Sequence, residues 1–242
     1  MSDRPVGQPP AHASPPEVLA PRPLDIDAVL FDLDGTLVDT APDLAGALNR
    51  VRADRGLEPL PIAALRPHAS AGARGLIGAG FRVTPDQDGY LALRDAFLAH
   101  YEVALCNDSA VFQGIADVLD AIVARGLRWG IVTNKATRYT QPLLVALALP
   151  RTPDVVVCGD TTPHSKPHPA PLLAAAVRLA VPPERCLYVG DAERDVEAGR
   201  AAGMPTLVAR YGYIQEHEEP EAWAAHGHLE RPTDLLAWLP QR

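Results

Sequence analysis

Short apolar runs alternate with amphipathic stretches along most of this chain. The apolar runs, which predict strands, span 27–33, 128–133, 154–159, 185–190 and 204–210. The stretches with apolar residues at helical spacing, which predict helices, span 114–126, 136–149, 168–180 and 192–203. Strands that are apolar throughout need cover on both faces. The alternation therefore predicts an α/β, Rossmann-like fold, with a parallel sheet and helices on both of its faces.

One long segment, 42–110, breaks this alternation. It contains helical patterns at 43–56, 61–69, 72–80 and 86–105, and no convincing strand. We therefore expect an all-helical domain over 42–110, inserted after the first strand, with hinges at its two joins. The core domain would then comprise 26–41 and 111–242.

The first residues of the chain have a different composition. Seven prolines and no apolar run fall within residues 1–23, which is typical of a disordered segment and not of a secretion signal. We expect residues 1–25 to be a disordered tail.

Composition limits the possible partners. With 22 Lys and Arg against 30 Asp and Glu, the formal net charge is -8, which disfavours binding to nucleic acid or anionic lipid. No stretch approaches the roughly 20 apolar residues that cross a bilayer. The cysteines, Cys106, Cys158 and Cys186, are odd in number and lack a C-x-x-C spacing, so neither a disulfide framework nor a thiolate metal site is predicted. We expect a cytoplasmic protein with no membrane or nucleic-acid partner.

Polar residues gather where the predicted strands end. They are Asp32, Asp34, Gly35 and Thr36 after the first strand, Thr133, Asn134 and Lys135 after the second, Lys166 in the loop after the third, and Gly190, Asp191 and Asp195 after the fourth. The carboxyl ends of parallel strands meet at one edge of a sheet, where ligands bind. We therefore expect these side chains to converge.

Several carboxylates at one edge would repel each other and have raised pKa values unless a cation joins them. Mg²⁺ suits such a site, because it binds through one or two carboxylates and leaves room for a phosphate oxygen. The sequence therefore predicts a magnesium site there.

Each cluster has a structural explanation when taken alone. Thr133 and Asn134 could cap the following helix, and Lys166 could be a solvated loop lysine. An EF-hand loop does not fit 32–36, because its glycine and glutamate belong at other positions. Clusters that follow consecutive predicted strands favour a shared functional site.

These clusters resemble the four motifs of the haloacid dehalogenase-like (HAD) phosphatases. The matching residues are D-x-D-G-T at 32–36, Thr133, Lys166 and G-D-x-x-x-D at 190–195. The resemblance covers the chain from about residue 26 to its end, and it implies that the helical insertion is a C1-type cap.

The resemblance also implies a mechanism. Asp32 would be the nucleophile that forms an aspartyl-phosphate, and Asp34 would protonate the leaving alcohol and then activate water. Dehalogenases lack the second aspartate, so Asp34 favours phosphoryl chemistry.

The remaining motif residues would bind metal and phosphate. By the same resemblance, Mg²⁺ would be held by the Asp32 carboxylate, the Asp34 backbone carbonyl and Asp191, with Asp195 orienting metal waters or Lys166. The phosphoryl group would be bound by Thr133, Lys166 and the backbone amides of Asn134 and Gly35.

The substrate is less closely defined. Arg74 lies at a predicted helix start in the insertion, where a guanidinium would suit a substrate carboxylate. The stretches V-T-N-K, S-K-P-H-P and A-R-Y-G-Y resemble phosphoglycolate phosphatases, and RADRGLEPL and SAGARGLI are closer to N-acetylmuramic acid 6-phosphate phosphatases. Both substrates carry a carboxylate, so both stay open.

Three other functions are alternatives to hydrolysis. A sugar phosphomutase of the same fold would use the same aspartates, and a noncatalytic phosphate-binding regulator would be expected to lack one of them. A nucleotide-sugar transferase with a D-x-D site would lack Lys166 and the 190–195 motif. The expected partner is a small phosphomonoester, and the protein could be a monomer or a homodimer.

His226 and His228 are expected to be solvated in a C-terminal loop.

Overall fold

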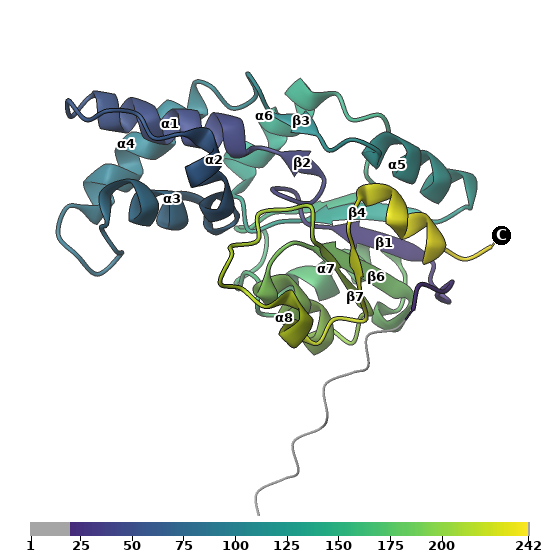
Figure 1. The fold of residues 1–242 in the computed structure, drawn as a ribbon. Coiled ribbons are helices and arrows are strands. Elements are labelled where there is room, and N and C mark those ends of the chain that lie inside the picture. Colours follow the sequence, from purple (N-terminus) through teal and green to yellow (C-terminus); the bar gives the residue numbers. More distant parts are fainter. Residues whose placement is uncertain (1–19, 242) are drawn as a thin grey trace, which may run out of the picture.

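A parallel sheet of six strands forms the centre of the computed structural model, which describes residues 20–241 (Figure 1). The strand order is β5-β4-β1-β6-β7-β8. The strands are β1 Ala28–Phe31, β4 Arg128–Val132, β5 Val155–Val157, β6 Cys186–Gly190, β7 Thr206–Ala209 and β8 Gly227–Leu229. The fold class predicted from the sequence is confirmed.

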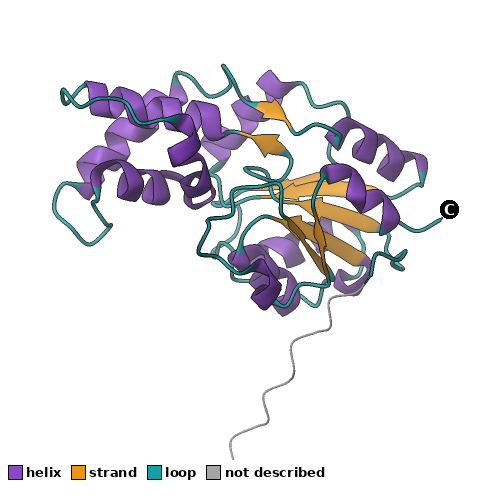
Figure 2. Ribbon diagram, viewed as in Figure 1, coloured by secondary structure: helices purple, strands orange, loops and turns teal. Residues whose placement is uncertain are grey.

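Helices cover both faces of this sheet (Figure 2). They are α5 Ile115–Ala124 and α6 Thr137–Leu147 on one face, and α7 Ala170–Leu179 and α8 Glu193–Ala201 on the other. In β1, Val29 and Phe31 pack toward the first layer, whereas Ala28 and Leu30 pack toward the second. Alternate side chains of a strand point to opposite faces, so an uninterrupted apolar run is what a doubly covered strand requires.

A group of helices lies beside the sheet and has its own hydrophobic core (Figure 1). It consists of α1 Ala41–Ala53, α2 Ile62–Leu65, a 3₁₀ segment Arg66–Ala71, α3 Gly72–Phe81 and α4 Tyr90–Glu102. Leu48, Ile77 and Phe97 are buried where these helices meet. We call this group the helical unit.

The chain enters and leaves the helical unit through a short antiparallel pair, β2 Val38–Asp39 and β3 Ala110–Val111. Two-residue strands have no periodicity, so the sequence did not predict them. The Tyr213 hydroxyl fixes the entry point, because it accepts hydrogen bonds from the amides of Thr40 at 2.7 Å and Ala41 at 2.9 Å and donates one to Asp39 at 2.8 Å.

The C-terminal segment differs from the expected loop. Residues Gly227–Leu229 form β8, parallel to β7, and 3₁₀ turns follow at Pro220–Trp223 and Pro232–Ala237. His226 is not simply solvated, since its Nδ1 accepts a hydrogen bond from the Thr206 amide at 3.1 Å. His228 lies in β8 itself. The expectation of two solvated loop histidines was therefore wrong.

The segment expected to be a tail lies mostly outside the described residues. Its end is attached to the core: the Leu24 amide donates to the Trp238 carbonyl at 2.9 Å, and Asp25 pairs with Arg185 at 2.7 Å. Arg185 belongs to a 3₁₀ turn, Pro183–Arg185, that precedes β6. Within residues 20–241, no helix has the length and apolar character needed to cross a membrane.

Candidate active site

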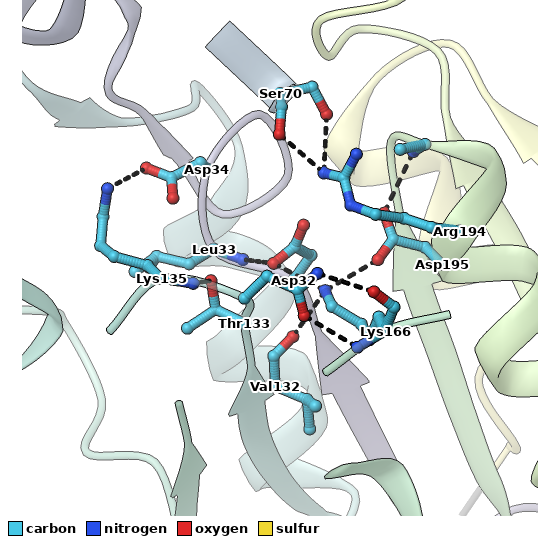
Figure 3. Close-up of polar contacts among 12 residues, drawn as sticks. Asp32, Leu33, Asp34, Ser70, Val132, Thr133, Lys135, Lys166, Arg194 and Asp195 are labelled. Atoms are coloured by element: carbon cyan, nitrogen blue, oxygen red, sulfur yellow. Dashed lines mark hydrogen bonds and ion pairs between the residues drawn. The ribbon is translucent and has the colours of Figure 1, made fainter. Parts of the chain in front are cut away.

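Asp32 is the first residue after β1, at the carboxyl edge of the sheet. Its side chain is buried, and its Oδ1 lies 3.0 Å from the Lys166 ammonium nitrogen (Figure 3). The same nitrogen lies 2.7 Å from Asp195 Oδ1. Asp32 and Lys166 come from separate loops and Asp195 from the first turn of α8, and the structure brings them together as the strand-end pattern predicts.

Three neighbours hold Lys166 in this position. Its ammonium group donates to the Val132 carbonyl at 2.9 Å and to the Tyr188 hydroxyl at 2.7 Å. The Asn134 side chain clamps the Lys166 backbone, donating to its carbonyl and accepting from its amide, both at 2.9 Å. Lys166 is therefore a cation held in one position, and it is not a solvated loop lysine.

Asp32, Asp191 and Asp195 form a buried acidic triad whose carboxylate oxygens lie within 4.8 Å of one another. Asp191 Oδ2 accepts a hydrogen bond from the Tyr213 amide at 2.9 Å, while its Oδ1 is buried and has no hydrogen-bond partner in the described chain. Burial, together with the neighbouring Asp32 and Asp195, raises the pKa of Asp191 to about 8. An orphaned carboxylate oxygen beside two other carboxylates fits a divalent cation.

The other two carboxyl groups of the triad differ from each other. Burial raises the pKa of Asp32, and Lys166 opposes that effect. Burial also disfavours the charge on Asp195, but Lys166 and Arg194 lower its pKa overall. Asp195 is thus the fixed counter-ion of Lys166.

Gly35 packs directly against this triad. A Cβ at Gly35 would lie 2.1 Å from Asp191 Oδ2, and the residue has a φ of 81°, in the left-handed region that suits glycine. Its amide donates to the Val38 carbonyl at 2.9 Å, so this donor, which the sequence suggested for phosphate, is already engaged. The structure gives Gly35 a different part, the close approach of the backbone to Asp191.

Asp34 points away from the triad (Figure 3). Its Oδ1 accepts a hydrogen bond from the Thr40 hydroxyl at 2.5 Å and lies 3.0 Å from the Lys135 ammonium nitrogen. Lys135 also lies 4.8 Å from the centre of the Tyr101 ring, on α4. Burial disfavours the Lys135 charge, yet Asp34 and Tyr101 together raise its pKa.

Thr133 and Asn134 follow β4 and line the same site. The buried Thr133 hydroxyl accepts a hydrogen bond from the Lys135 amide at 3.2 Å. Among residues 20–241, the backbone amide of Asn134 has no hydrogen-bond partner. The N-cap of α6 is Ala136, with no side-chain cap, so neither Thr133 nor Asn134 caps this helix. The Thr133 contact lies in the loop before α6 and leaves the backbone amide of Asn134 free to donate.

A cavity of about 870 Å³ separates the sheet edge from the helical unit. On the sheet side it is lined by Asp32, Asp34, Thr133, Asn134, Lys135, Lys166 and Arg194, and on the other side by residues that include Ser70, Arg74, Phe97, Leu98 and Tyr101. Arg74 is exposed at this lining and makes no described polar contact. Asp32 is the member of the acidic triad that lines this cavity.

The sequence analysis placed Lys135 at a strand end without assigning it a role, and it did not single out Tyr101 or Arg194, which also line the cavity. Lys135 directly follows Thr133 and Asn134, and Arg194 lies between two motif aspartates, so proximity to the motifs was an available signal for both. Tyr101 gives no such signal, since it reads as one aromatic residue in an amphipathic helix.

Comparison with known proteins agrees with this geometry. Residues 26–203 match the family model described as haloacid dehalogenase-like hydrolase. An N-acetylmuramic acid 6-phosphate phosphatase from Pseudomonas aeruginosa is 40% identical over 211 residues, covering 87% of this chain and 93% of that protein. A phosphoglycolate phosphatase from Xanthomonas campestris pv. campestris is 42% identical over 213 residues, covering 88% and 95%.

A solved structure has the same fold over nearly its whole length. It is a predicted phosphoglycolate phosphatase from Haemophilus somnus, with a TM-score of 0.76 and 27% identity, covering 88% of this chain and 97% of that one. The family match spans the strands that carry Asp32, Lys166 and Asp191. The chain therefore belongs to the haloacid dehalogenase-like hydrolase family and is a phosphoric monoester hydrolase.

Proposed function

We propose that this protein hydrolyses a carboxylate-bearing phosphomonoester with Mg²⁺ as cofactor and Asp32 as nucleophile. The observation that supports this most directly is the position of Asp32. It lies at the cavity floor, 3.0 Å from the buried Lys166 ammonium nitrogen, within an acidic triad that contains an unpaired oxygen.

The metal would be held by the carboxylates of Asp32 and Asp191 and by the backbone carbonyl of Asp34. Asp195 would not bind the metal directly but would orient Lys166 or the metal waters, because Lys166 already occupies one of its oxygens. When bound, Mg²⁺ would offset negative charge on the triad and on the phosphoryl oxygens.

The side chains themselves would carry the chemistry in two steps. A carboxylate oxygen of Asp32 attacks phosphorus, the bond from phosphorus to the ester oxygen breaks, and Asp34 gives its proton to the departing alkoxide. Asp34 then takes a proton from water as that water attacks the phosphorus of the aspartyl-phosphate. The bond from phosphorus to Asp32 breaks and phosphate leaves. For this, Asp34 has to turn from Lys135 toward the cavity.

The phosphoryl oxygens would be bound by the Lys166 ammonium group, the Thr133 hydroxyl and the free backbone amide of Asn134. All three line the cavity next to Asp32, and such fixed donors stabilise charge that develops on the oxygens in the transition state. The helical unit would act as the cap that closes over the substrate, with Arg74 at its edge facing a second anion.

Cavity size bears on the two substrates left open by the sequence. A volume of about 870 Å³ is near the upper end of the range for small-molecule sites, and it far exceeds a two-carbon acid phosphate. Aromatic and apolar side chains of Phe97, Leu98 and Tyr101 line its far side. We therefore favour N-acetylmuramic acid 6-phosphate over 2-phosphoglycolate.

The test is kcat/KM with Mg²⁺ on both acids and on a panel of sugar phosphates, with phosphate release and sugar isomers both measured. We expect release of phosphate, with the larger acid preferred. Formation of a phosphosugar isomer would support the phosphomutase alternative, and no turnover of any phosphomonoester would support the noncatalytic one.

Gly35→Ala should weaken Mg²⁺ binding. The new Cβ would lie 2.1 Å from Asp191 Oδ2 and displace that carboxylate, so we expect a loss of about tenfold or more in Mg²⁺ affinity, measured by isothermal titration calorimetry. Gly126→Ala is the matched control, because Gly126 also has a positive φ, 68°, but nothing lies within 4 Å of the added Cβ. Equal effects of both substitutions would show that backbone strain alone is responsible.

Mg²⁺ affinity should rise with pH. The metal-free Asp191 has a pKa of about 8, so near neutral pH it is largely protonated and must lose its proton to bind the ion. We expect affinity to increase up to about tenfold per pH unit from pH 6 and to level off above pH 8. Calorimetry in buffers of different ionisation enthalpy should detect the released proton, and a pH-independent affinity would contradict the assignment.

Asp191 also makes the stability of the metal-free protein depend on pH. Its folded pKa is raised above the unfolded value of 3.8, so its contribution to the free energy of unfolding is full below pH 4 and is lost as pH rises toward 8. Mg²⁺ should therefore raise the melting temperature more at pH 8 than at pH 6.

A further inference from the structure

Arg194 lies in the first turn of α8, between Asp191 and Asp195 of the motif. Its side chain extends across the cavity toward the helical unit, where Nη2 donates to the Ser70 carbonyl at 2.8 Å and to the Ser70 hydroxyl at 3.0 Å (Figure 3). The two residues are 124 positions apart in the sequence. Arg194 is a side chain of the core that contacts the opposite wall of the cavity.

This guanidinium is only partly satisfied. Within the described chain, Nε and Nη1 have no hydrogen-bond partner, and no carboxylate oxygen lies within 4.0 Å of the group as an ion pair. Arg194 is partly buried, and it lines the cavity. The carboxylates of Asp195, Asp32 and Asp191 raise the pKa of Arg194 against the effect of burial, but none of them forms a direct ion pair with it, and arginine has five donors that match an anion.

The nearest acids interact with Arg194 only through their charge, and each has a direct contact elsewhere. Asp32 and Asp195 share the Lys166 ammonium nitrogen, and Asp191 is bound by the Tyr213 amide. Asp32 and Asp191 would also bind the metal. The anion that completes the surroundings of Arg194 would therefore come from the substrate.

The position of Arg194 indicates which part of the substrate this is. The phosphoryl end has its own donors in Lys166, Thr133 and Asn134, on the sheet side of Asp32. Figure 3 shows the Arg194 guanidinium on the other side, between Asp32 and Ser70. The alcohol that leaves phosphorus on the side away from Asp32, toward the helical unit, would pass beside Arg194.

We propose that Arg194 binds the carboxylate of the leaving group and is thereby the main determinant of preference for acid-bearing phosphomonoesters. This rests on the function proposed above. Arg194 is better placed for it than Arg74, because Arg74 is exposed and has no contact that fixes its guanidinium. The Ser70 contacts hold Nη2 and leave Nε and Nη1 free to donate to the carboxylate.

The test uses two substrate pairs whose members differ in a carboxylate. They are 2-phosphoglycolate with 2-hydroxyethyl phosphate, and N-acetylmuramic acid 6-phosphate with N-acetylglucosamine 6-phosphate. We would measure kcat/KM with Mg²⁺ for the wild-type enzyme, Arg194→Gln and Arg74→Gln. Arg194→Met, which keeps an unbranched stem in the cavity wall, is a second variant in case the first does not fold.

We expect the wild-type enzyme to prefer the acid member of at least one pair. Replacing Arg194 should reduce that preference by about tenfold or more, mainly through KM for the acid, and replacing Arg74 should reduce it less. The pair that responds identifies the source of the carboxylate.

Three results are separable. If Arg194 variants lose equal activity on acid and neutral members, Arg194 is a tether to Ser70 or a phosphoryl ligand, and the proposal is wrong. A larger change in Arg74→Gln than in Arg194→Gln would also overturn it. If the wild-type enzyme turns over no member of either pair, the proposed function fails instead.

Discussion

Asp32→Asn should abolish phosphatase activity and leave the fold intact. The amide cannot act as the nucleophile, so we expect kcat to fall by about 10⁴-fold or more. Stability should change little, since Asp32 is a buried acid whose pKa is raised by burial, and Lys166 keeps Asp195 at 2.7 Å as its counter-ion. Steady-state kinetics and thermal unfolding without Mg²⁺ measure the two effects.

Asp195→Asn is a useful comparison for this result. It also removes one carboxylate of the triad, but it takes from Lys166 its closest counter-ion, at 2.7 Å, so its melting temperature should fall more than that of Asp32→Asn. Near wild-type turnover by Asp32→Asn would show that another group attacks phosphorus.

Lys166→Met should damage both activity and stability. It leaves Asp32 and Asp195 buried without the cation they share, and breaking a buried ion pair in this way costs about 3–5 kcal/mol. Loss of the positive charge beside the nucleophile should lower kcat by about 10³-fold. Urea unfolding and kinetics at saturating Mg²⁺ test these expectations.

Lys135→Met is the matched variant, because Lys135 is a second buried lysine in the same cavity, paired with Asp34. Asp34 is more exposed than Asp32 and keeps its hydrogen bond from Thr40. We therefore expect a smaller loss of stability than for Lys166→Met. Equal losses would mean that the two carboxylates of the triad are not strongly dependent on Lys166.

The longest predicted elements were those that the structure confirmed. The strands β1, β4, β5, β6 and β7 of the parallel sheet are apolar runs that pack against helices, so burial alone determines their sequence pattern. The strands β2 and β3 have two residues each, which is too short for any periodicity, and β8, although as long as β5, is not an apolar run. Their conformation depends on neighbouring strands that are distant in sequence.

The candidate site was predictable to the extent that strand ends determine it. Asp32, Lys166 and Asp191 follow three strands of one sheet edge, so topology brings them together. The contact of Asp34 with Lys135 joins two loops of the core, whereas that of Arg194 with Ser70 depends on how the helical unit packs over that edge. Side-chain direction decided these contacts, and a backbone hydrogen bond within the turn engaged the Gly35 amide with the Val38 carbonyl; no periodicity of the sequence encodes either.

The most direct test of the account is to trap the phosphorylated enzyme. Enzyme mixed with substrate and Mg²⁺ would be quenched in acid within a single turnover, reduced with borohydride and digested, and the modified residue would be identified by mass spectrometry. We expect homoserine at position 32, from reduction of an aspartyl-phosphate, and none in Asp32→Asn. Modification of a different residue, or turnover with no trapped species under any quench time, would contradict nucleophilic attack by Asp32.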